Sequence, residues 1–232
     1  MIYILTACLV LVFLLFFTSY LLYRGVFYYP QKKHVDPYQI PDDMLYAPYK
    51  NAMLHLLHEM EQTPYEEVSI RSQDGLSLCG RLYLFRPDAP LMLFFHGYHG
   101  TFLWDGLGSF RFCRKNHINL LVVDERSHGK SADQIITFGI RECKDVKCWA
   151  DYAAKRFPEK SLILSGVSMG SASVMMASVL SLPSSVKALM RLRIHCPCRN
   201  YQRNHTVFSS AGCLLLCPAA LWRTHFRALQ SQ

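Results

Sequence analysis

The chain has 232 residues, of which 51% are hydrophobic, 13% aromatic and 18% charged. This composition excludes a disordered or collagen-like chain, and nine cysteines in this length are too few for a small disulfide scaffold. The net charge of +8 is unevenly placed, because residues 1–168 carry 18 basic and 17 acidic side chains whereas residues 169–232 carry seven basic and no acidic ones. These basic residues are scattered among cysteines and leucines, which does not indicate a nucleic-acid-binding protein.

The amino-terminal segment is predicted to be a transmembrane anchor over residues 1–23, in contact with the lipid bilayer. Its first 22 residues carry no charge, and as a helix they would span roughly 33 Å, enough to cross a hydrocarbon core. The alternative is a cleaved signal peptide, but no basic residue precedes the apolar run and no small-residue cleavage site follows it. Arg24, Lys32 and Lys33 follow the span, so the positive-inside rule predicts a single-pass protein whose domain is cytoplasmic.

Residues 24–65 are predicted to be a linker followed by an amphipathic helix. Three prolines and mixed charges in residues 28–43 favour an extended linker, and apolar residues at near-helical spacing predict a helix over residues 44–62. Two acidic residues at positions 42 and 43 suit its amino-terminal cap. His55 and His58 lie one turn apart in this helix, a spacing that a metal site can use, but no third ligand pattern accompanies them.

The next part of the chain alternates between strand and helix patterns. Strands are predicted at residues 67–72, 76–85, 91–95, 120–124 and 162–165, and helices at residues 107–115 and 139–156. An Asp74-Gly75 step joins the first two strands as a hairpin turn. The later strands are continuous apolar runs, which is typical of strands buried on both faces of a parallel sheet. The predicted fold class is therefore α/β, with flanking helices.

The predicted strand at 162–165 runs into Gly166-Val167-Ser168-Met169-Gly170, and a helix-compatible segment follows. This G-x-S-x-G pattern is typical of a nucleophile elbow. The sharp turn needs glycine two residues before and two residues after the serine, because side chains there would collide with the sheet and the helix. The turn also places Ser168 at a helix amino terminus, which favours developing negative charge. The alternative is an ordinary surface turn.

Two further loops follow strand-like runs. His96-Gly97-Tyr98-His99-Gly100 follows residues 91–95, and an Asp-Glu-Arg-Ser-His-Gly-Lys-Ser turn begins at Asp124 and contains His128. With the elbow, these loops resemble the HG-x-x-G loop and the D-x-R-x-H-G-x-S turn of the α/β-hydrolase superfamily. The similarity is greatest to its serine-aminopeptidase/lysophospholipase-like (S33-type) branch.

The resemblance implies a role for each of these residues. Ser168 would be the nucleophile of an ester or amide hydrolase that acts on a small molecule, with a lipid or a peptide as the alternatives, through an acyl-serine intermediate. The backbone N–H groups of Tyr98 and Met169 would form the oxyanion hole. The other matched residues would be structural: Gly166 and Gly170 in the elbow, His96 and Gly97 in the loop, and Asp124 and His128 in the turn. No metal or organic cofactor is implied.

The resemblance covers residues 66–189 and ends there. In the family the catalytic acid and histidine follow the serine, but no Asp or Glu follows Ser168 in this chain. Residues 190–232 form an atypical basic, cysteine-rich tail, as a shifted reading frame would produce, so the carboxyl-terminal strands are predicted to be missing and the activity impaired. A zinc site in this tail is the other interpretation, although its cysteine spacing is unusual. Its ligands would be Cys196, Cys198, Cys213, Cys217 and His205. The alternative function is a non-catalytic, truncated, membrane-tethered protein of this fold.

Overall fold

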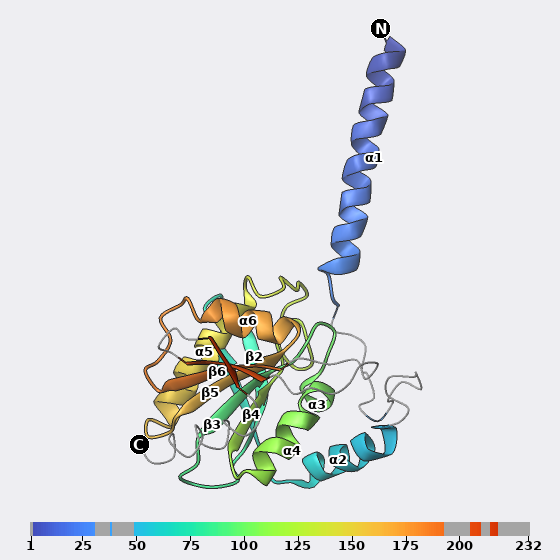
Figure 1. Ribbon diagram of the computed structural model, residues 1–232. Helices are drawn as coiled ribbons and strands as arrows, with labels where there is room; N and C mark the ends of the chain where they lie inside the picture. The colour runs from blue at the N-terminus through green and yellow to red at the C-terminus, as the bar shows by residue number, and fades with distance from the viewer. Residues whose placement is uncertain (1, 31–37, 39–48, 193–204, 210–213, 218–232) are drawn as a thin grey trace.

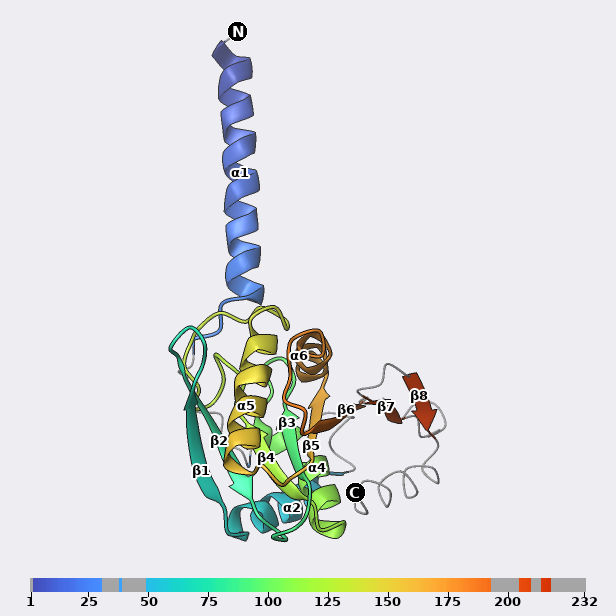
Figure 2. The same ribbon diagram turned by 90° about the vertical axis from the view of Figure 1, so that its left-hand side faces the viewer.

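The computed structural model describes residues 2–30, 38, 49–192, 205–209 and 214–217. It contains a long amino-terminal helix, α1 (Ile2–Val26), which rises away from an α/β domain (Figures 1 and 2). No residue of α1 is buried, and its mean hydropathy of 2.5 makes it apolar enough to cross a membrane, a property that signal sequences share. The helix coincides with the segment that the sequence predicts as an anchor.

The domain is built on one mixed sheet in the order β1-β2-β4-β3-β5-β6-β7-β8. Strands β4, β3, β5 and β6 run parallel to one another, and the β1–β2 hairpin joins them through an antiparallel β2–β4 pairing. The first six strands are β1 (Glu66–Arg71), β2 (Ser77–Tyr83), β3 (Leu91–Phe95), β4 (Asn119–Val123), β5 (Leu162–Val167) and β6 (Val186–Leu192). The α/β class with a mostly parallel central sheet is confirmed.

Helices cover both faces of the sheet. The helices that follow α1 are α2 (Lys50–Gln62), α3 (Phe102–Asp105), α4 (Leu107–Lys115), α5 (Glu142–Arg156) and α6 (Met169–Ala177). Alternate residues of β3 point to opposite faces. Leu93 belongs to a core cluster with α5 and α6, whereas Met92 and Phe94 belong to a second cluster with α2 and α4. This two-sided burial explains why the central strands are continuous apolar runs.

The helices differ from the sequence prediction in three places, one of which is α5, predicted from residue 139 and observed from Glu142. Helix α2 begins at Lys50, while residues 44–48 and the acidic residues predicted as its cap lie outside the described residues. The short helix α3 is not predicted. Its N-cap is Thr101, whose side chain accepts a hydrogen bond from the Trp104 N–H at 3.2 Å, and this cap lets a single turn form directly after the glycine-rich loop.

Two short strands follow β6, where the sequence predicts that the sheet stops. They are β7 (His205–Ser209) and β8 (Leu214–Cys217), both antiparallel to their neighbours. The sheet thus extends two strands beyond the predicted ones, because an unpaired edge of β6 can be covered by any apolar extended segment. In the described part of the chain no parallel strand follows β6. The zinc ligands considered for the tail lie outside the residues whose side chains are described.

Candidate active site

Ser168 lies at the junction of β5 and α6. Its backbone has φ 51° and ψ −114°, and its side chain is exposed at the carboxyl end of the strand. A positive φ is uncommon for a residue with a Cβ atom, and such strain is concentrated at functional sites. The sharp turn presents the Ser168 hydroxyl at the amino terminus of a nine-residue helix.

The two glycines of the elbow have no room for a side chain. A Cβ atom on Gly166 would lie 2.4 Å from the backbone carbon of Gly170. A Cβ atom on Gly170 would lie 2.2 Å from the backbone oxygen of Phe95, at the end of β3. The G-x-S-x-G spacing is therefore a packing requirement in this chain, because strand β5, helix α6 and strand β3 approach one another at backbone contact.

The loop after β3 lies directly beside the serine. A Cβ atom on Gly97 would be 3.4 Å from the Cβ atom of Ser168, and the Gly97 N–H donates to Asp105 Oδ2 at 2.7 Å. In the part of the chain that the structure describes, the N–H groups of Tyr98 and Met169 have no hydrogen-bond acceptor. Two free backbone donors thus flank the serine, an arrangement suited to a developing oxyanion.

Asp105 is a residue of this site that the sequence does not single out. It lies in α3, and its carboxylate fixes the loop that contains Gly97. Burial raises the pKa of Asp105, while the Gly97 N–H opposes that shift. The signal in the sequence is weak, since an Asp five residues after a Gly-rich loop has no motif of its own.

His96 is completely buried behind the loop, and both of its ring nitrogens are occupied. The Glu125 N–H donates to Nε2 at 3.0 Å, so Nδ1 carries the proton and donates to the Gly97 carbonyl at 2.8 Å. Burial lowers the pKa of His96 to about 4. A histidine in this state is neutral at pH 7 and has no free nitrogen with which to accept a proton from Ser168.

Asp124 organises the turn after β4. Its Oδ2 accepts the Lys130 N–H at 3.0 Å, and its backbone oxygen accepts the Ser131 hydroxyl at 2.7 Å. A Cβ atom on Gly129, which has φ 50°, would lie 2.1 Å from Asp124 Oδ2. Burial raises the pKa of Asp124 to about 7, although the hydrogen bond from Lys130 opposes this. All of these contacts are within the turn, so Asp124 holds the loop closed.

His128 lies in the same turn, buried against His96 with ring centroids 4.7 Å apart. Its Nδ1 donates to the Arg126 carbonyl at 2.9 Å, whereas its Nε2 has no hydrogen-bond partner among the described residues. Burial is the main reason why the pKa of His128 falls to about 3. His128 is therefore a neutral ring packed in the loop.

Arg126 connects this turn to the rest of the domain, a role that the sequence does not reveal. The side chain is only 2% exposed, and it forms a two-pronged ion pair with Asp145 of α5 at 2.6 and 2.7 Å. It also contacts Asp74 of the β1–β2 hairpin at 3.0 Å, and this guanidinium holds the pKa of Asp74 far below its usual range. The turn, the hairpin and α5 are thereby fixed to one another.

The described residues place no histidine in hydrogen-bond contact with Ser168. His96 and His128 are engaged in loop contacts, and His99 is held in a left-handed conformation, φ 53°, with its ring stacked on Tyr29 and Tyr98. Within the described part, the structure therefore places neither a histidine base nor an orienting acid next to Ser168.

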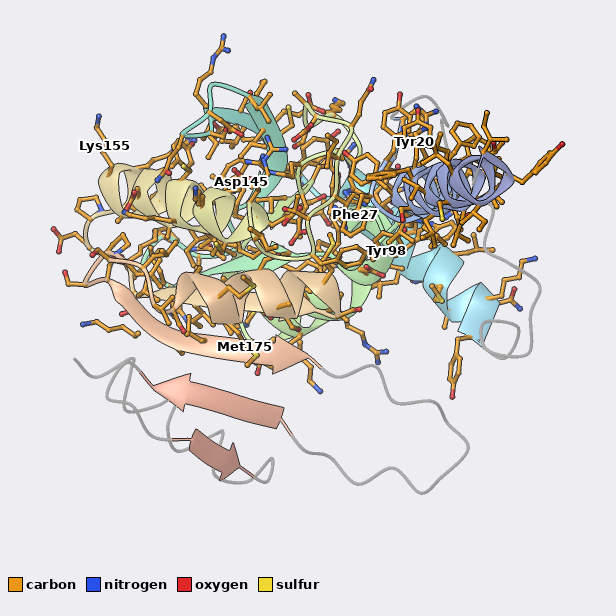
Figure 3. The ribbon with its side chains drawn as sticks, turned by 90° about the horizontal axis from the view of Figure 1, so that it is seen from above. Tyr20, Phe27, Tyr98, Asp145, Lys155 and Met175 are labelled. Atoms are coloured by element: carbon orange, nitrogen blue, oxygen red, sulfur yellow. The ribbon has the colours of Figure 1, made fainter. Side chains whose placement is uncertain are left out.

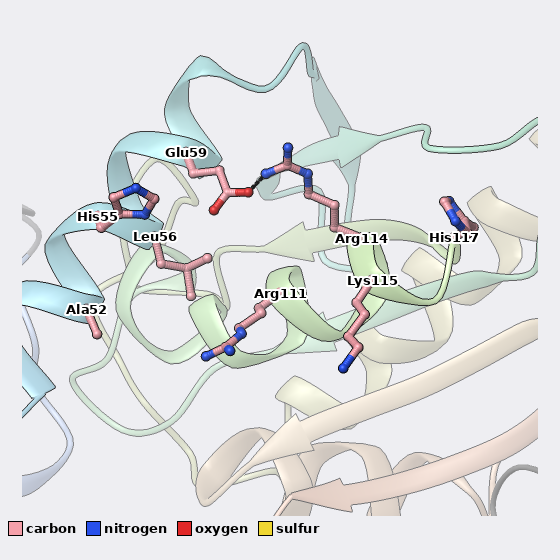
Figure 4. Close-up of a pocket in the computed structure, with 8 residues that line it drawn as sticks. All are labelled: Ala52, His55, Leu56, Glu59, Arg111, Arg114, Lys115 and His117. Atoms are coloured by element: carbon pink, nitrogen blue, oxygen red, sulfur yellow. Dashed lines mark ion pairs between the residues drawn. The ribbon is translucent and has the colours of Figure 1, made fainter.

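A shallow groove of about 720 Å³ lies elsewhere, between α2 and α4 (Figure 4). Its basic lining includes Lys115 and His117, which precede β4. The groove is therefore at the amino ends of the parallel strands, whereas Ser168 is at their carboxyl ends. Glu59 forms an ion pair with Arg114 across it. Among the described residues no cluster of three His, Cys, Asp or Glu side chains is arranged to hold a metal ion.

No protein-family model matches the chain. Among solved structures, it is similar to the Pyrococcus furiosus esterase Pf2001, with a TM-score of 0.49 and 24% identity over 53% of this chain and 49% of that one. It is also similar to XC6422 from Xanthomonas campestris, an α/β serine hydrolase without a lid, with a TM-score of 0.44 and 22% identity over 52% of this chain and 58% of that one. The chain spans about half the length of the Pyrococcus esterase.

The strand–elbow–helix unit on a mixed sheet places the described residues in the α/β-hydrolase fold. This agrees with the family that the elbow and its two neighbouring loops resemble. The likeness to the S33-type branch in particular stays a prediction.

Proposed function

We propose that this chain is a serine hydrolase of the α/β-hydrolase type whose nucleophile is Ser168 and whose substrates are small carboxylic esters or amides. The Ser168 hydroxyl would attack the substrate carbonyl, and its proton would pass to the departing alcohol or amine as the acyl-serine forms. Water then releases the acid and restores the hydroxyl. The N–H groups of Tyr98 and Met169 would stabilise the oxyanion in both steps.

The observation that carries the proposal is the strained, exposed Ser168, together with the N–H groups of Tyr98 and Met169, which have no acceptor among the described residues. A serine in an ordinary surface turn gains nothing from positive φ or from glycines packed against β3. The cost of that conformation is accounted for if the hydroxyl must reach a substrate. This supports the hydrolase over the non-catalytic alternative.

We further propose that hydrolysis by this chain is slow. No acidic residue follows Ser168, and His96 and His128 are engaged in loop contacts. A serine hydroxyl without an adjacent base is a weak nucleophile, and a serine protease loses about 10⁴ in kcat when only the acid of its triad becomes an amide. The oxyanion hole alone leaves a residual rate.

The membrane part of the proposal rests on the length and apolar character of α1. We propose that α1 stays attached as a single-pass anchor, with the domain on the cytoplasmic side, where Arg24 and the lysines at positions 32 and 33 would lie. Carbonate-resistant pelleting tests the anchor. Recovery of a mature form that begins near Tyr20 would contradict it.

The test of the catalytic proposal is hydrolysis of p-nitrophenyl butyrate by the detergent-solubilised full chain and by Ser168→Ala. The expected result is a small excess rate that disappears in the variant. No difference between the two proteins would favour the non-catalytic alternative. An excess of several hundred-fold would show that an acid and a base reach Ser168, and the proposed impairment would be wrong.

A further inference from the structure

The end of α1 is attached to the loop that flanks Ser168. Val26 is the last residue of α1, and the final carbonyls of a helix have no partner within the helix. The Tyr98 hydroxyl donates to the Val26 carbonyl at 2.8 Å. A residue of the oxyanion loop thus caps the helix that is apolar enough to cross a membrane.

Residues 26–29, which we call the strap, also pair with a second loop of the domain. The Tyr29 N–H donates to the Gln134 carbonyl at 2.7 Å, and the Ile136 N–H donates to the Phe27 carbonyl at 2.8 Å. The Tyr28 hydroxyl donates to Gln134 Oε1 at 3.0 Å. Two backbone hydrogen bonds and one side-chain hydrogen bond therefore attach the strap to the segment at residues 134–136.

A series of rings joins the strap to the active-site loop. Phe27 of the strap packs edge-on against Phe138, with ring centroids 5.6 Å apart, and Phe138 stacks on Tyr98 at 5.0 Å. Tyr98 in turn stacks on His99 at 3.8 Å, and His99 stacks on Tyr29 of the strap at 4.3 Å. Figure 3, seen from above, shows Phe27 and Tyr98 together at the base of α1. These contacts place the loop beside Ser168 at the foot of α1.

The loop that pairs with the strap exposes two large apolar side chains. Phe138 is 39% exposed and Ile140 is 66% exposed. Both lie within six residues of the strap's backbone partner Gln134, and the loop that joins β4 to α5 lies at the end of the domain from which α1 rises (Figure 1). Since α1 is continuous with the strap, a bilayer around α1 is the surface that would cover these side chains.

We propose that the strap holds the mouth of the Ser168 site against the bilayer surface, and that the substrate is an amphiphilic ester dissolved in the membrane. Such a substrate would keep its acyl chain in the lipid while its ester carbonyl reaches Ser168 at the interface. This inference rests on the proposed function and on insertion of α1. We therefore expect no preference for a freely soluble ester, because a soluble substrate gains nothing from a site fixed at the foot of the anchor.

Contact between the bilayer and the loop that contains Phe138 and Ile140 is tested without any reaction at Ser168. The full chain with Ile140→Trp is reconstituted in phosphatidylcholine vesicles whose acyl chains are brominated, and the tryptophan fluorescence is compared with that of the parent. The added tryptophan is expected to be quenched. Lys115→Trp, at the amino ends of the parallel strands, is the matched control and is expected to behave as in water. Equal quenching of both variants, or of neither, would overturn the docking.

The substrate class is tested by two fluorophosphonates, one with a long alkyl chain dissolved in the vesicles and one that is short and water-soluble. Tyr29→Ala removes two ring contacts of the strap, with His99 and His128, and is expected to slow labelling by the long probe about tenfold while changing the short-probe rate less than about twofold. Tyr20→Ala, within α1 and outside the strap, is expected to change neither rate.

The outcomes separate the two proposals. Equal slowing of both probes by Tyr29→Ala would overturn the substrate class, because the strap would then act only on the shape of the loop. Absence of labelling by either probe in the parent would remove the proposed function and the substrate class with it. The quenching experiment would still decide whether the loop that contains Phe138 and Ile140 lies at the bilayer.

Discussion

Substitution of Gly170 by alanine tests the geometry of the elbow most severely. The new Cβ atom would lie 2.2 Å from the Phe95 oxygen and 2.6 Å from the His96 oxygen, both backbone atoms that no rotamer change can remove. Either β3 and the loop after it or the start of α6 must move by roughly 1 Å, and misplacement on that scale costs about 10²-fold in rate. Overpacking of this kind also costs about 1–3 kcal/mol of stability.

The assay measures the rate at which a short fluorophosphonate labels the solubilised chain and, in parallel, the temperature of thermal unfolding. Gly170→Ala is expected to label about a hundred times more slowly than the parent and to unfold several degrees lower. Gly108→Ala is the matched control, because a Cβ atom there meets nothing within 4 Å, and replacing an exposed helical glycine stabilises by about 0.5–1 kcal/mol. A Gly170→Ala protein that labels within threefold of the parent would refute the described contact between β3 and α6.

Two further predictions concern the turn after β4. Asp145→Asn leaves the buried Arg126 with a neutral partner and is expected to lower the free energy of unfolding by about 3–5 kcal/mol. The control is Asp151→Asn, in an exposed pair on the same helix, which should change the free energy of unfolding by less than about 0.5 kcal/mol. Equal effects of the two variants in denaturant melts would show that the buried pair does not connect the turn to α5. His128→Asn keeps a donor for the Arg126 carbonyl and removes a group whose pKa burial lowers to about 3. Because the folded parent resists a proton that the unfolded chain accepts below about pH 6.5, the parent loses stability as the pH falls from 6.5 to 3, and the variant should lose up to about 1.4 kcal/mol less per pH unit. The exposed His58→Asn variant is the control, and a slope for His128→Asn identical to that of the parent would contradict the burial of a neutral ring.

The central strands and the elbow follow from local patterns. Strand β3 occurs at the predicted residues because five consecutive apolar side chains are buried on both faces, and helix α4 occurs at the predicted residues 107–115. The glycines at 166 and 170 are required by backbone contacts that any strand–turn–helix of this shape imposes. Such features depend on neighbours within a few residues, so the sequence alone predicts them.

The contacts that connect distant segments were not predictable. The strap pairs with residues more than 100 positions away, and a segment of three aromatic residues before a proline carries no period that indicates a partner. The ion pairs of Arg126 with Asp74 and Asp145 likewise depend on how the hairpin and α5 meet. In the sequence, nothing distinguishes these charged residues from solvent-exposed ones, because their partners are brought close only by the fold of the sheet.

Covalent labelling with peptide mapping decides whether Ser168 is the reactive nucleophile of the chain. The full chain is incubated with a short fluorophosphonate, digested and analysed by tandem mass spectrometry, beside Ser168→Ala and Ser178→Ala, the latter an exposed serine just after α6. We expect a slow but complete conversion to a single adduct on Ser168 in the parent and in Ser178→Ala, and none in Ser168→Ala. An adduct on another serine, or no adduct on Ser168 in folded protein, would contradict it.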